Sequence, residues 1–298
     1  MNYHNPVLLE ECIKGLKINP KGIYIDATFG GGGHSKEILK NLTSGKLIAV
    51  DQDSDAEKNL FQNDKILFIN HNFKYLSNFL NYYDIKTANG ILADLGISSH
   101  QINTEERGFS YRFDSTLDMR MNKNQEISAI DILNKYSEND LFRIFKEFGE
   151  IKNTYKLVSK ITDFRKKEKI LKTNQFIEAI SEITPKTNRN KYLSKIFQAI
   201  RIELNKEIEA LKKFLLQTID IIIPGGRLVI ITYHSIEDRI VKNFMRTGNF
   251  KGTQEKDFYG NLLAPFLPIN KKVITPSEQE IINNNRARSA KLRIAEKK

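Results

Sequence analysis

The stretch IYIDATFGGGGHSKEILKNL, residues 23–42, decides the fold class of this chain. It begins with a short apolar run that ends in the carboxylate of Asp26. Four glycines follow at 30–33, and apolar residues then recur over 38–42 at the spacing of one helix face. A strand, a glycine turn and a helix in this order are typical of a nucleoside-binding βαβ unit. Glycines let a ligand approach the backbone, and the helix N-terminus presents unpaired N–H groups.

Two phosphate-binding motifs are not met at this turn. The dinucleotide fingerprint G-x-G-x-x-G fails because Ser35 stands where its third glycine would fall. No Gly-Lys-Ser/Thr follows the glycines, which excludes the phosphate loop of nucleoside triphosphatases. The turn therefore indicates a nucleoside site preceded by a carboxylate, and an ordinary tight strand-to-helix turn is the alternative.

Further apolar runs predict a parallel sheet. Runs of strand length occur at 46–51, 66–69, 90–96 and 227–232. Helical patterns separate the first four strands, and this alternation predicts an α/β fold with a doubly wound, mainly parallel sheet and right-handed crossovers. Its ligands should gather at the carboxyl ends of the strands. Weaker runs at 273–275 and 291–294 are expected to be closing strands.

The alternation of strands and helices stops after Gln101. Residues 141–148 and 176–183 show the apolar spacing of amphipathic helices, and one long helix is expected over 191–221. The returning strand follows that helix. These patterns predict an α/β domain interrupted by a helical insert.

We predict that the α/β domain comprises 1–104 and 190–298, and that the inserted helical domain comprises 105–189. The formal net charge is +11, and residues 152–201 hold thirteen Lys and Arg against four acids, an excess of nine. Six more basic residues lie within 286–298. Clustered positive charge suggests a polyanionic partner, nucleic acid before membrane. Solvated faces of a lysine-rich protein are the alternative.

The remaining composition bounds the setting of the protein. Cys12 is the only cysteine, so an internal disulfide and a cysteine zinc site are excluded and a reducing cytoplasm is expected. The N-terminus shows no signal pattern, and no apolar run reaches the length of a membrane span. We expect a cytoplasmic protein without membrane association.

Three carboxylates fall at three successive strand ends: Asp26, Asp51 and Asp94. Asp51 follows the glycine turn near the roughly 20-residue offset at which an acidic side chain accepts hydrogen bonds from ribose hydroxyls. We predict that role for Asp51, with an ordinary surface aspartate as the alternative. Phe73 after the third strand is a candidate to flank an adenine ring, although an aromatic residue there is more often core. Such a site suits S-adenosylmethionine as well as NAD, and the missing dinucleotide fingerprint disfavours NAD.

Histidines give weaker signals. His34 is a candidate either to bind the cofactor or to cap its own helix. His234 resembles a metal ligand beside Glu237 and Asp238, but Ser235 begins what looks like a helix cap at this turn. No metal site is predicted.

Six motifs occur in an order that carries a family resemblance. They are DATFGGGGHS (26–35), DLGISSHQIN (94–103), RGFSYRFDSTLDMRM (107–121), IFQAIRIELNKEIE (196–209), GGRLVIITYHSIEDRIVKNF (225–244) and NNNRARSAKLRIAE (283–296). Together they resemble the bacterial 16S ribosomal RNA cytosine-N4 methyltransferase family. The similarity begins at HNPVLL (4–9) and covers essentially the whole chain.

The resemblance implies a Rossmann-like methyltransferase domain with an inserted helical domain for substrate recognition. It implies S-adenosylmethionine as methyl donor and a cytosine N4 in the decoding region of 16S ribosomal RNA as acceptor. The expected partner is this RNA or the small ribosomal subunit, and we expect a monomer or a homodimer. The cofactor motifs match at Gly32, Gly33, His34, Asp51, Phe73, Asp94 and Gln101.

The chemistry of the acceptor favours Asp94 as the catalytic candidate. Cytosine N4 is a poor nucleophile because its lone pair is delocalised into the ring, so the enzyme must position the amine and accept an N–H hydrogen bond. Asp94-Leu95-Gly96 occupies the place of the Asp/Asn-Pro-Pro-aromatic turn of many amino-methyltransferases, but lacks its prolines and ring. Contact with the cofactor alone is the other role open to Asp94. A non-catalytic RNA-binding or assembly protein and an NAD-dependent dehydrogenase are the alternative functions.

Overall fold

The computed structural model describes residues 6–270 and 272–298. The chain divides into two compact units, one of Met1–Gly96 with Glu209–Lys298 and one of Ile97–Ile208. The units describe how the chain packs. The predicted domain limits, 1–104 with 190–298 and 105–189, stay a prediction. The first residues of the HNPVLL motif, His4 and Asn5, lie outside the described residues.

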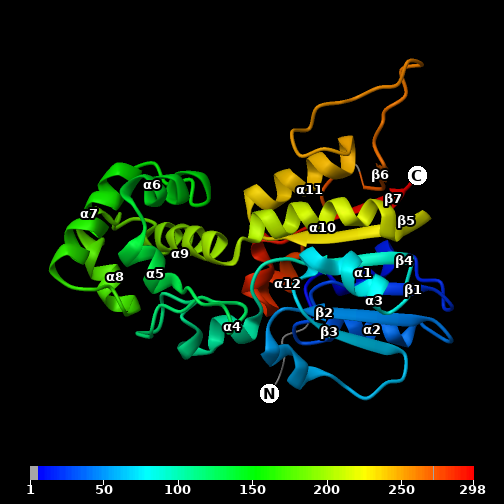
Figure 1. The fold of residues 1–298 in the computed structure, drawn as a ribbon, viewed down its shortest axis with the longest axis horizontal. Coiled ribbons are helices and arrows are strands. Elements are labelled where there is room, and N and C mark those ends of the chain that lie inside the picture. Colours follow the sequence, from blue (N-terminus) through cyan, green and yellow to red (C-terminus); the bar gives the residue numbers. More distant parts are fainter. Residues whose placement is uncertain (1–5, 271) are drawn as a thin grey trace. The chain divides into compact units, whose positions relative to one another are not determined.

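The first unit is built on a sheet of seven strands in the order β3-β2-β1-β4-β5-β7-β6 (Figure 1). The strands are β1 (Ile23–Asp26), β2 (Lys46–Asp51), β3 (Ile66–Asn70), β4 (Ala88–Asp94), β5 (Ile222–Thr232), β6 (Phe266–Pro268) and β7 (Lys291–Lys297). Strands β1 to β5 are parallel, and β7 runs antiparallel to both β5 and β6. The predicted α/β fold class with a mainly parallel sheet is confirmed.

All the helices described in this unit except the last bury apolar side chains. They are α1 (Leu9–Leu16), α2 (Gly33–Lys40), α3 (Leu76–Tyr82), α10 (Glu207–Ile221), α11 (Ser235–Thr247) and α12 (Glu278–Asn283), with short 3-10 turns η1 (Ser54–Asn59), η2 (Phe73–Tyr75) and η5 (Asn285–Ser289). The first two residues of α10, Glu207 and Ile208, belong to the other unit. Leu16 of α1 and Ile38 of α2 share one buried cluster with Leu47, Val229 and Leu292 of the sheet. Burying these side chains stabilises the layers by about 1.5–3 kcal/mol for each large aliphatic residue.

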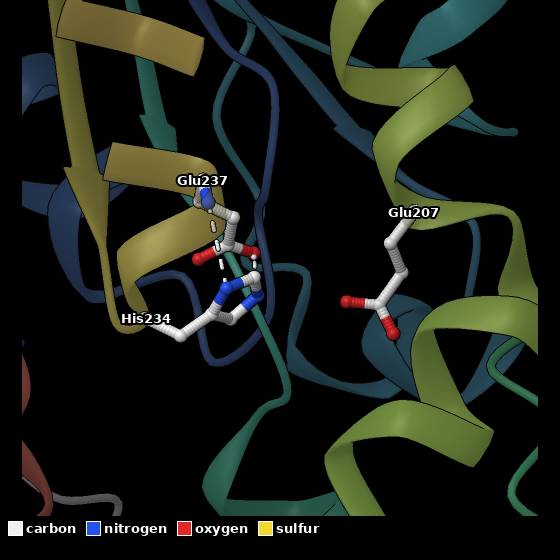
Figure 2. Close-up of side chains that lie close together, drawn as sticks. All are labelled: Glu207, His234 and Glu237. Atoms are coloured by element: carbon white, nitrogen blue, oxygen red, sulfur yellow. Dashed lines mark hydrogen bonds and ion pairs between the residues drawn. The ribbon is translucent and has the colours of Figure 1, made fainter. Parts of the chain in front are cut away.

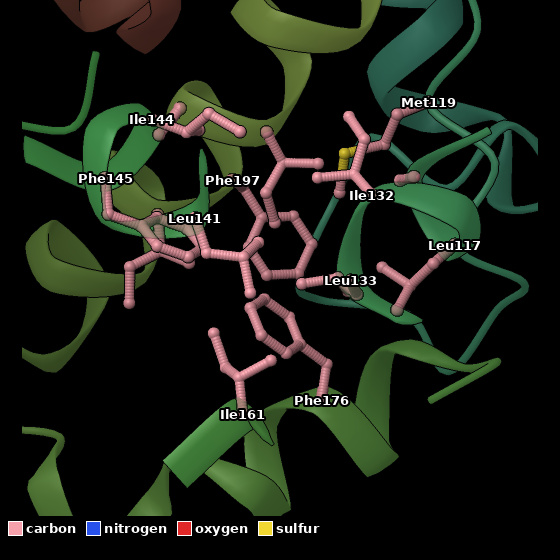
Figure 3. Close-up of a cluster of buried hydrophobic side chains, with 14 of the residues drawn as sticks. Leu117, Met119, Ile132, Leu133, Leu141, Ile144, Phe145, Ile161, Phe176 and Phe197 are labelled. Atoms are coloured by element: carbon pink, nitrogen blue, oxygen red, sulfur yellow. The ribbon is translucent and has the colours of Figure 1, made fainter. Parts of the chain in front are cut away.

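The second unit is helical among the described residues. Its helices are α4 (Ser99–Asn103), α5 (Ala129–Lys135), α6 (Glu138–Glu147), α7 (Thr154–Lys167), α8 (Thr173–Ala179) and α9 (Arg189–Asn205), with 3-10 turns η3 (Glu105–Arg107) and η4 (Ser181–Ile183). Figure 3 shows its core, in which Leu141 and Phe145 of α6 gather with Phe176 of α8 and Phe197 of α9. The helix predicted at 141–148 is therefore confirmed as α6, whereas the one predicted at 176–183 is α8, which ends at Ala179, followed by the 3-10 turn η4.

Two predictions of secondary structure are wrong. The single helix expected over 191–221 is two helices, because Lys206 adopts a left-handed conformation with φ 50° between α9 and α10. The closing strand expected at 273–275 is only an isolated bridge between Ile274 and Leu292. Strand β6 pairs with β7 at the edge instead, and this strand was not predicted. None of the helices in the described residues combines the length and apolar character needed to cross a bilayer.

Candidate active site

The glycine turn lies between β1 and α2, and its backbone conformation requires glycine at several positions. Gly30 and Gly32 have φ angles of 50° and 72°, a region in which an L side chain is strained. A Cβ added at Gly32 would lie 2.9 Å from the ring of Phe29, and one added at Gly33 would lie 2.2 Å from Pro6. Glycine at these two predicted cofactor positions therefore lets Phe29 and Pro6 pack directly against the turn, and contact with a cofactor there stays a prediction.

Asp26 holds the turn from inside. Its buried carboxylate accepts hydrogen bonds from the backbone N–H of Thr28 at 3.1 Å and from the hydroxyl of Ser35 at 2.7 Å. The Thr28 hydroxyl oxygen in turn accepts the backbone N–H of Asp94 at 2.6 Å. Burial raises the pKa of Asp26. Both of its oxygens are thus used to fix the turn, and the turn is tied to the end of β4.

Asp51 ends β2 directly beside the glycine turn. Its carboxylate accepts the backbone N–H of Gly30 at 2.7 Å and the backbone N–H of Asp53 at 2.9 Å. Burial raises the pKa of Asp51 to about 6, and these two hydrogen bonds oppose the shift. The structure brings Asp51 and the turn together, while the predicted contact with ribose stays a prediction.

Asp94 ends β4, on the other side of β1. The hydroxyl of Tyr233 donates a hydrogen bond of 2.8 Å to Oδ1 of Asp94. Burial raises the pKa of Asp94 to about 6, opposed by the charge of His34 and by the Tyr233 hydrogen bond. The Tyr233 hydroxyl is buried beside this carboxylate, and both effects raise its pKa well above its usual value. Tyr233 is therefore a neutral donor that fixes one oxygen of Asp94.

His34 is buried in the first turn of α2. Its Nε2 lies 3.1 Å from the carbonyl oxygen of Val7, and burial lowers its pKa. The N-cap of α2 is Gly32, so the capping role considered for His34 is not observed. Its predicted contact with the cofactor stays a prediction.

The other two predicted cofactor residues have structural partners. Phe73 begins η2 after β3, and its ring lies 5.0 Å from the ring of Phe214 in α10. Gln101 belongs to the helical unit, where its side-chain oxygen accepts the backbone N–H of Ser98 and closes a capping box at α4. Phe73 therefore has a packing contact and Gln101 a capping contact, and their cofactor roles remain predictions.

The turn after β5 is held by its own side chains, as Figure 2 shows. Nδ1 of His234 accepts the backbone N–H of Glu237 at 3.4 Å, and its Nε2 lies 3.1 Å from Oε1 of that residue. The cap of α11 is therefore His234 instead of the expected Ser235. Glu207, also drawn, belongs to the helical unit, where Arg201 binds its carboxylate at 2.8 Å.

Comparison with known proteins identifies the family. The model of the MraW methylase family matches residues 1–298. This chain belongs to the MraW methylase family. Relatives named ribosomal RNA small subunit methyltransferase H are 52% identical in Bacteroides thetaiotaomicron, over 100% of this chain and 98% of the relative, and 53% identical in Christiangramia forsetii, with the same coverage. The resemblance found in the six motifs is confirmed, and the chain is a methyltransferase.

In this MraW-family methylase, the order of the strands explains the layout of the site. Strands β2 and β4 flank β1, so Asp51 and Asp94 lie on either side of the glycine turn that follows β1. Two carboxylates there can accept hydrogen bonds from hydroxyl or amine groups of bound molecules. Tyr233 was missed by the sequence reasoning. Tyr233 directly follows the last residue of β5, and the three aspartates are the last residues of β1, β2 and β4. This position at the carboxyl end of a parallel strand was the sequence signal for Tyr233.

Proposed function

We propose that this methylase transfers a methyl group from S-adenosylmethionine to the exocyclic N4 of a cytosine in 16S ribosomal RNA, in the decoding region of the small subunit. The observation that carries the proposal is the glycine turn after β1, which lies between the half-buried carboxylates of Asp51 and Asp94 at the ends of β2 and β4. It occurs in a chain at least half identical to proteins named for methylation of small-subunit ribosomal RNA. The reaction takes place in the cytoplasm, and the enzyme is a monomer or a homodimer.

The residues of the turn fit a nucleoside cofactor. Gly30 has open space beside it, because an added Cβ would meet only the carbonyl oxygen of Thr28 at 3.9 Å, and the backbone of Gly32 and Gly33 would contact the cofactor. Two backbone N–H groups hold the carboxylate of Asp51 at the end of β2. Asp51 would hold the ribose hydroxyls, and Phe73 would lie against the adenine. When bound, S-adenosylmethionine supplies a methyl group already activated by its sulfonium.

Asp94 is the residue that would assist the acceptor amine. An ionised carboxylate accepts an N–H of the amine and stabilises positive charge that develops on nitrogen during transfer. Tyr233 occupies Oδ1 of this carboxylate with a hydrogen bond and so orients it. With a pKa of about 6, Asp94 is mostly ionised at neutral pH and is able to act as an acceptor.

The helical insert, residues 105–189, would recognise the RNA through phosphate contacts. Residues 152–189 of the insert hold ten Lys and Arg against four acids, an excess of six, which supports this role. Replacing three exposed lysines of this segment by glutamine, Lys156, Lys169 and Lys186, should weaken RNA binding and flatten its salt dependence. The affinity for S-adenosylmethionine should hold. An unchanged salt slope would make the basic excess a solvated surface.

The decisive experiment is methyl transfer followed by product analysis. The purified protein is incubated with small subunits or 16S ribosomal RNA and S-adenosylmethionine carrying an isotopically labelled methyl group. Nucleoside mass spectrometry should locate the label on N4 of one cytosine. A label on ring carbon C5 would contradict the mechanism, because that transfer typically uses a cysteine nucleophile and the only cysteine, Cys12, is buried in the core. Calorimetric titration with S-adenosylmethionine and with NAD separates this proposal from a dehydrogenase.

A further inference from the structure

The segment between α11 and β6 carries a small hairpin that ends in two aromatic residues. In Figure 1 this segment is the orange loop that runs out beyond α11. Lys256 and Leu262 form an antiparallel bridge, and the backbone N–H of Leu263 donates to the carbonyl of Glu255 at 2.9 Å. We call residues 255–263 the aromatic hairpin. The proposed site at the glycine turn uses none of these residues.

The tip of the aromatic hairpin is closed by several hydrogen bonds. The backbone N–H of Asp257 donates to the carbonyl of Asn261, and the N–H of Gly260 donates to the carbonyl of Asp257. Both the backbone N–H and the side-chain amide of Asn261 donate to the Asp257 carboxylate, at 2.8 and 3.0 Å, and these bonds lower the pKa of Asp257. Gly260 has a φ of 85°, which a glycine adopts without strain. The tip is therefore an ordered turn.

This ordered turn presents its two aromatic side chains to solvent. Phe258 is 98% exposed and Tyr259 is 86% exposed. Their rings stand nearly perpendicular, with an interplanar angle of 87°, so each leaves a ring face open. Scattered exposed apolar residues are ordinary, but two adjacent aromatic rings on a turn held by its own hydrogen bonds are the geometry of a contact surface.

The charge beside the hairpin selects the class of partner. Residues 239–263, which lead into the hairpin and include it, contain five basic side chains against two acidic ones, Glu255 and Asp257, an excess of three. Arg246, Lys251 and Lys256 are exposed. Aromatic side chains beside a net positive charge are the features that bind single-stranded nucleic acid, because bases stack on the rings and phosphates are attracted to the cations.

We propose that the aromatic hairpin is an RNA contact in which unpaired bases stack on Phe258 and Tyr259. The identity of the RNA as 16S ribosomal RNA rests on the proposed function, whereas stacking on unpaired bases rests on the hairpin itself. Stacking is tolerant of sequence because every base has an aromatic face. The hairpin therefore adds affinity for unpaired RNA and leaves the choice of the methylated base to the residues around Asp94.

The absence of tryptophan from the sequence provides a direct test. Phe258→Trp keeps an aromatic ring at the tip and gives the protein a single indole reporter. Adding a single-stranded oligouridine should quench its fluorescence, because the indole stacks on a base. In parallel, the double variant Phe258→Ala/Tyr259→Ala should bind both the oligouridine and 16S ribosomal RNA about tenfold more weakly or worse. Its affinity for S-adenosylmethionine should not change.

Tyr82→Ala is the matched control, because Tyr82 is 81% exposed on α3 of the same unit and has no basic segment leading to it. This control should bind RNA as the wild type does. An indole that is not quenched, or a double variant with wild-type RNA affinity, would overturn the proposal. So would sedimentation showing that the wild type self-associates through the hairpin, or quenching by anionic lipid vesicles but not by RNA.

The outcome also separates this inference from the proposed function. If the wild type methylates cytosine N4 but the double variant keeps its RNA affinity, only the hairpin proposal fails. If the wild type does not methylate 16S ribosomal RNA but the indole is quenched by oligouridine, the proposed reaction fails and the stacking surface stands.

Discussion

The ends of β2 and β4 carry two carboxylates with the same pKa of about 6. The two carboxylates accept hydrogen bonds from different kinds of donor. Asp51 is held by two backbone N–H groups, one from the glycine turn and one from Asp53. Asp94 accepts, among the described residues, one side-chain hydrogen bond, from Tyr233. A substitution does not remove the backbone N–H donors of Asp51, whereas it can remove the hydroxyl donor of Asp94. Asp51 is therefore built into the turn, and Asp94 is a carboxylate whose properties a single side chain adjusts.

The largest expected effect comes from Asp94→Asn, which keeps the size of the side chain and an acceptor oxygen but removes the charge. Single-turnover methylation at saturating cofactor should slow by about 10²-fold or more, as when one preorganised electrostatic contact is lost. The measurement is the rate of label transfer to RNA. A rate near that of the wild type, with only a raised dissociation constant for S-adenosylmethionine, would limit Asp94 to cofactor binding.

Asp51→Ala should give the opposite pattern. Loss of the carboxylate removes hydrogen bonds to the cofactor and should weaken binding of S-adenosylmethionine by about 1–3 kcal/mol. The rate at saturating cofactor should change much less than in Asp94→Asn. Calorimetric titration measures the affinity, and circular dichroism controls for folding because the backbone N–H of Gly30 also loses its acceptor. An unchanged dissociation constant in a folded variant would remove Asp51 from the cofactor site.

Tyr233→Phe removes only the hydroxyl that orients Asp94. The rate at saturation should fall by about tenfold, the loss of one hydrogen bond to a charged group. The Tyr233 hydrogen bond lowers the pKa of Asp94, so without it that pKa rises. The acidic limb of the pH–rate profile, expected near pH 6 in the wild type, should therefore move to higher pH. A profile that stays in place would show that Tyr233 does not act through Asp94.

The smallest effect concerns stability. The pKa of Asp94 is about 6 in the folded protein and about 3.9 in an unfolded chain, so the folded state binds the proton more tightly. The stability from this group is complete below pH 4 and is lost as the pH rises through 6. Asp94→Asn lacks this loss, so the variant should gain about 1 kcal/mol or more over the wild type at pH 8 and little at pH 4.

Asp51→Asn sharpens the contrast with Asp94. An amide nitrogen at position 51 would face one of the two backbone N–H donors, so this variant should show no such gain at pH 8. Urea unfolding at both pH values measures the difference. Equal gains in stability at pH 8 would mean that the hydrogen-bond donors of the two carboxylates do not determine the effect of the substitution.

The sequence was sufficient for features that are encoded locally. Buried strands are visible in the sequence as apolar runs, and the turn is visible as four consecutive glycines. The parallel strands, and the placement of Asp51 beside the turn, followed from these two patterns. The break at Lys206 carried no signal, because a lysine in left-handed conformation looks like any other helix residue. The pairing of Tyr233 with Asp94 was also hidden. This pairing depends on β5 lying beside β4, although 127 residues separate the end of β4 from the start of β5.

The place of β7 in the sheet has a consequence for synthesis of the protein. Strand β7 lies between β5 and β6, although it is encoded after both of them. A nascent chain that has not yet reached Lys291 therefore carries β5 with an unpaired edge, and the residues there include the apolar run Leu228 to Ile231. Exposed apolar edges of this kind recruit other strands. Co-translational folding of this sheet is complete only after Lys297 has left the ribosome, and translation that stalls earlier yields an aggregation-prone chain.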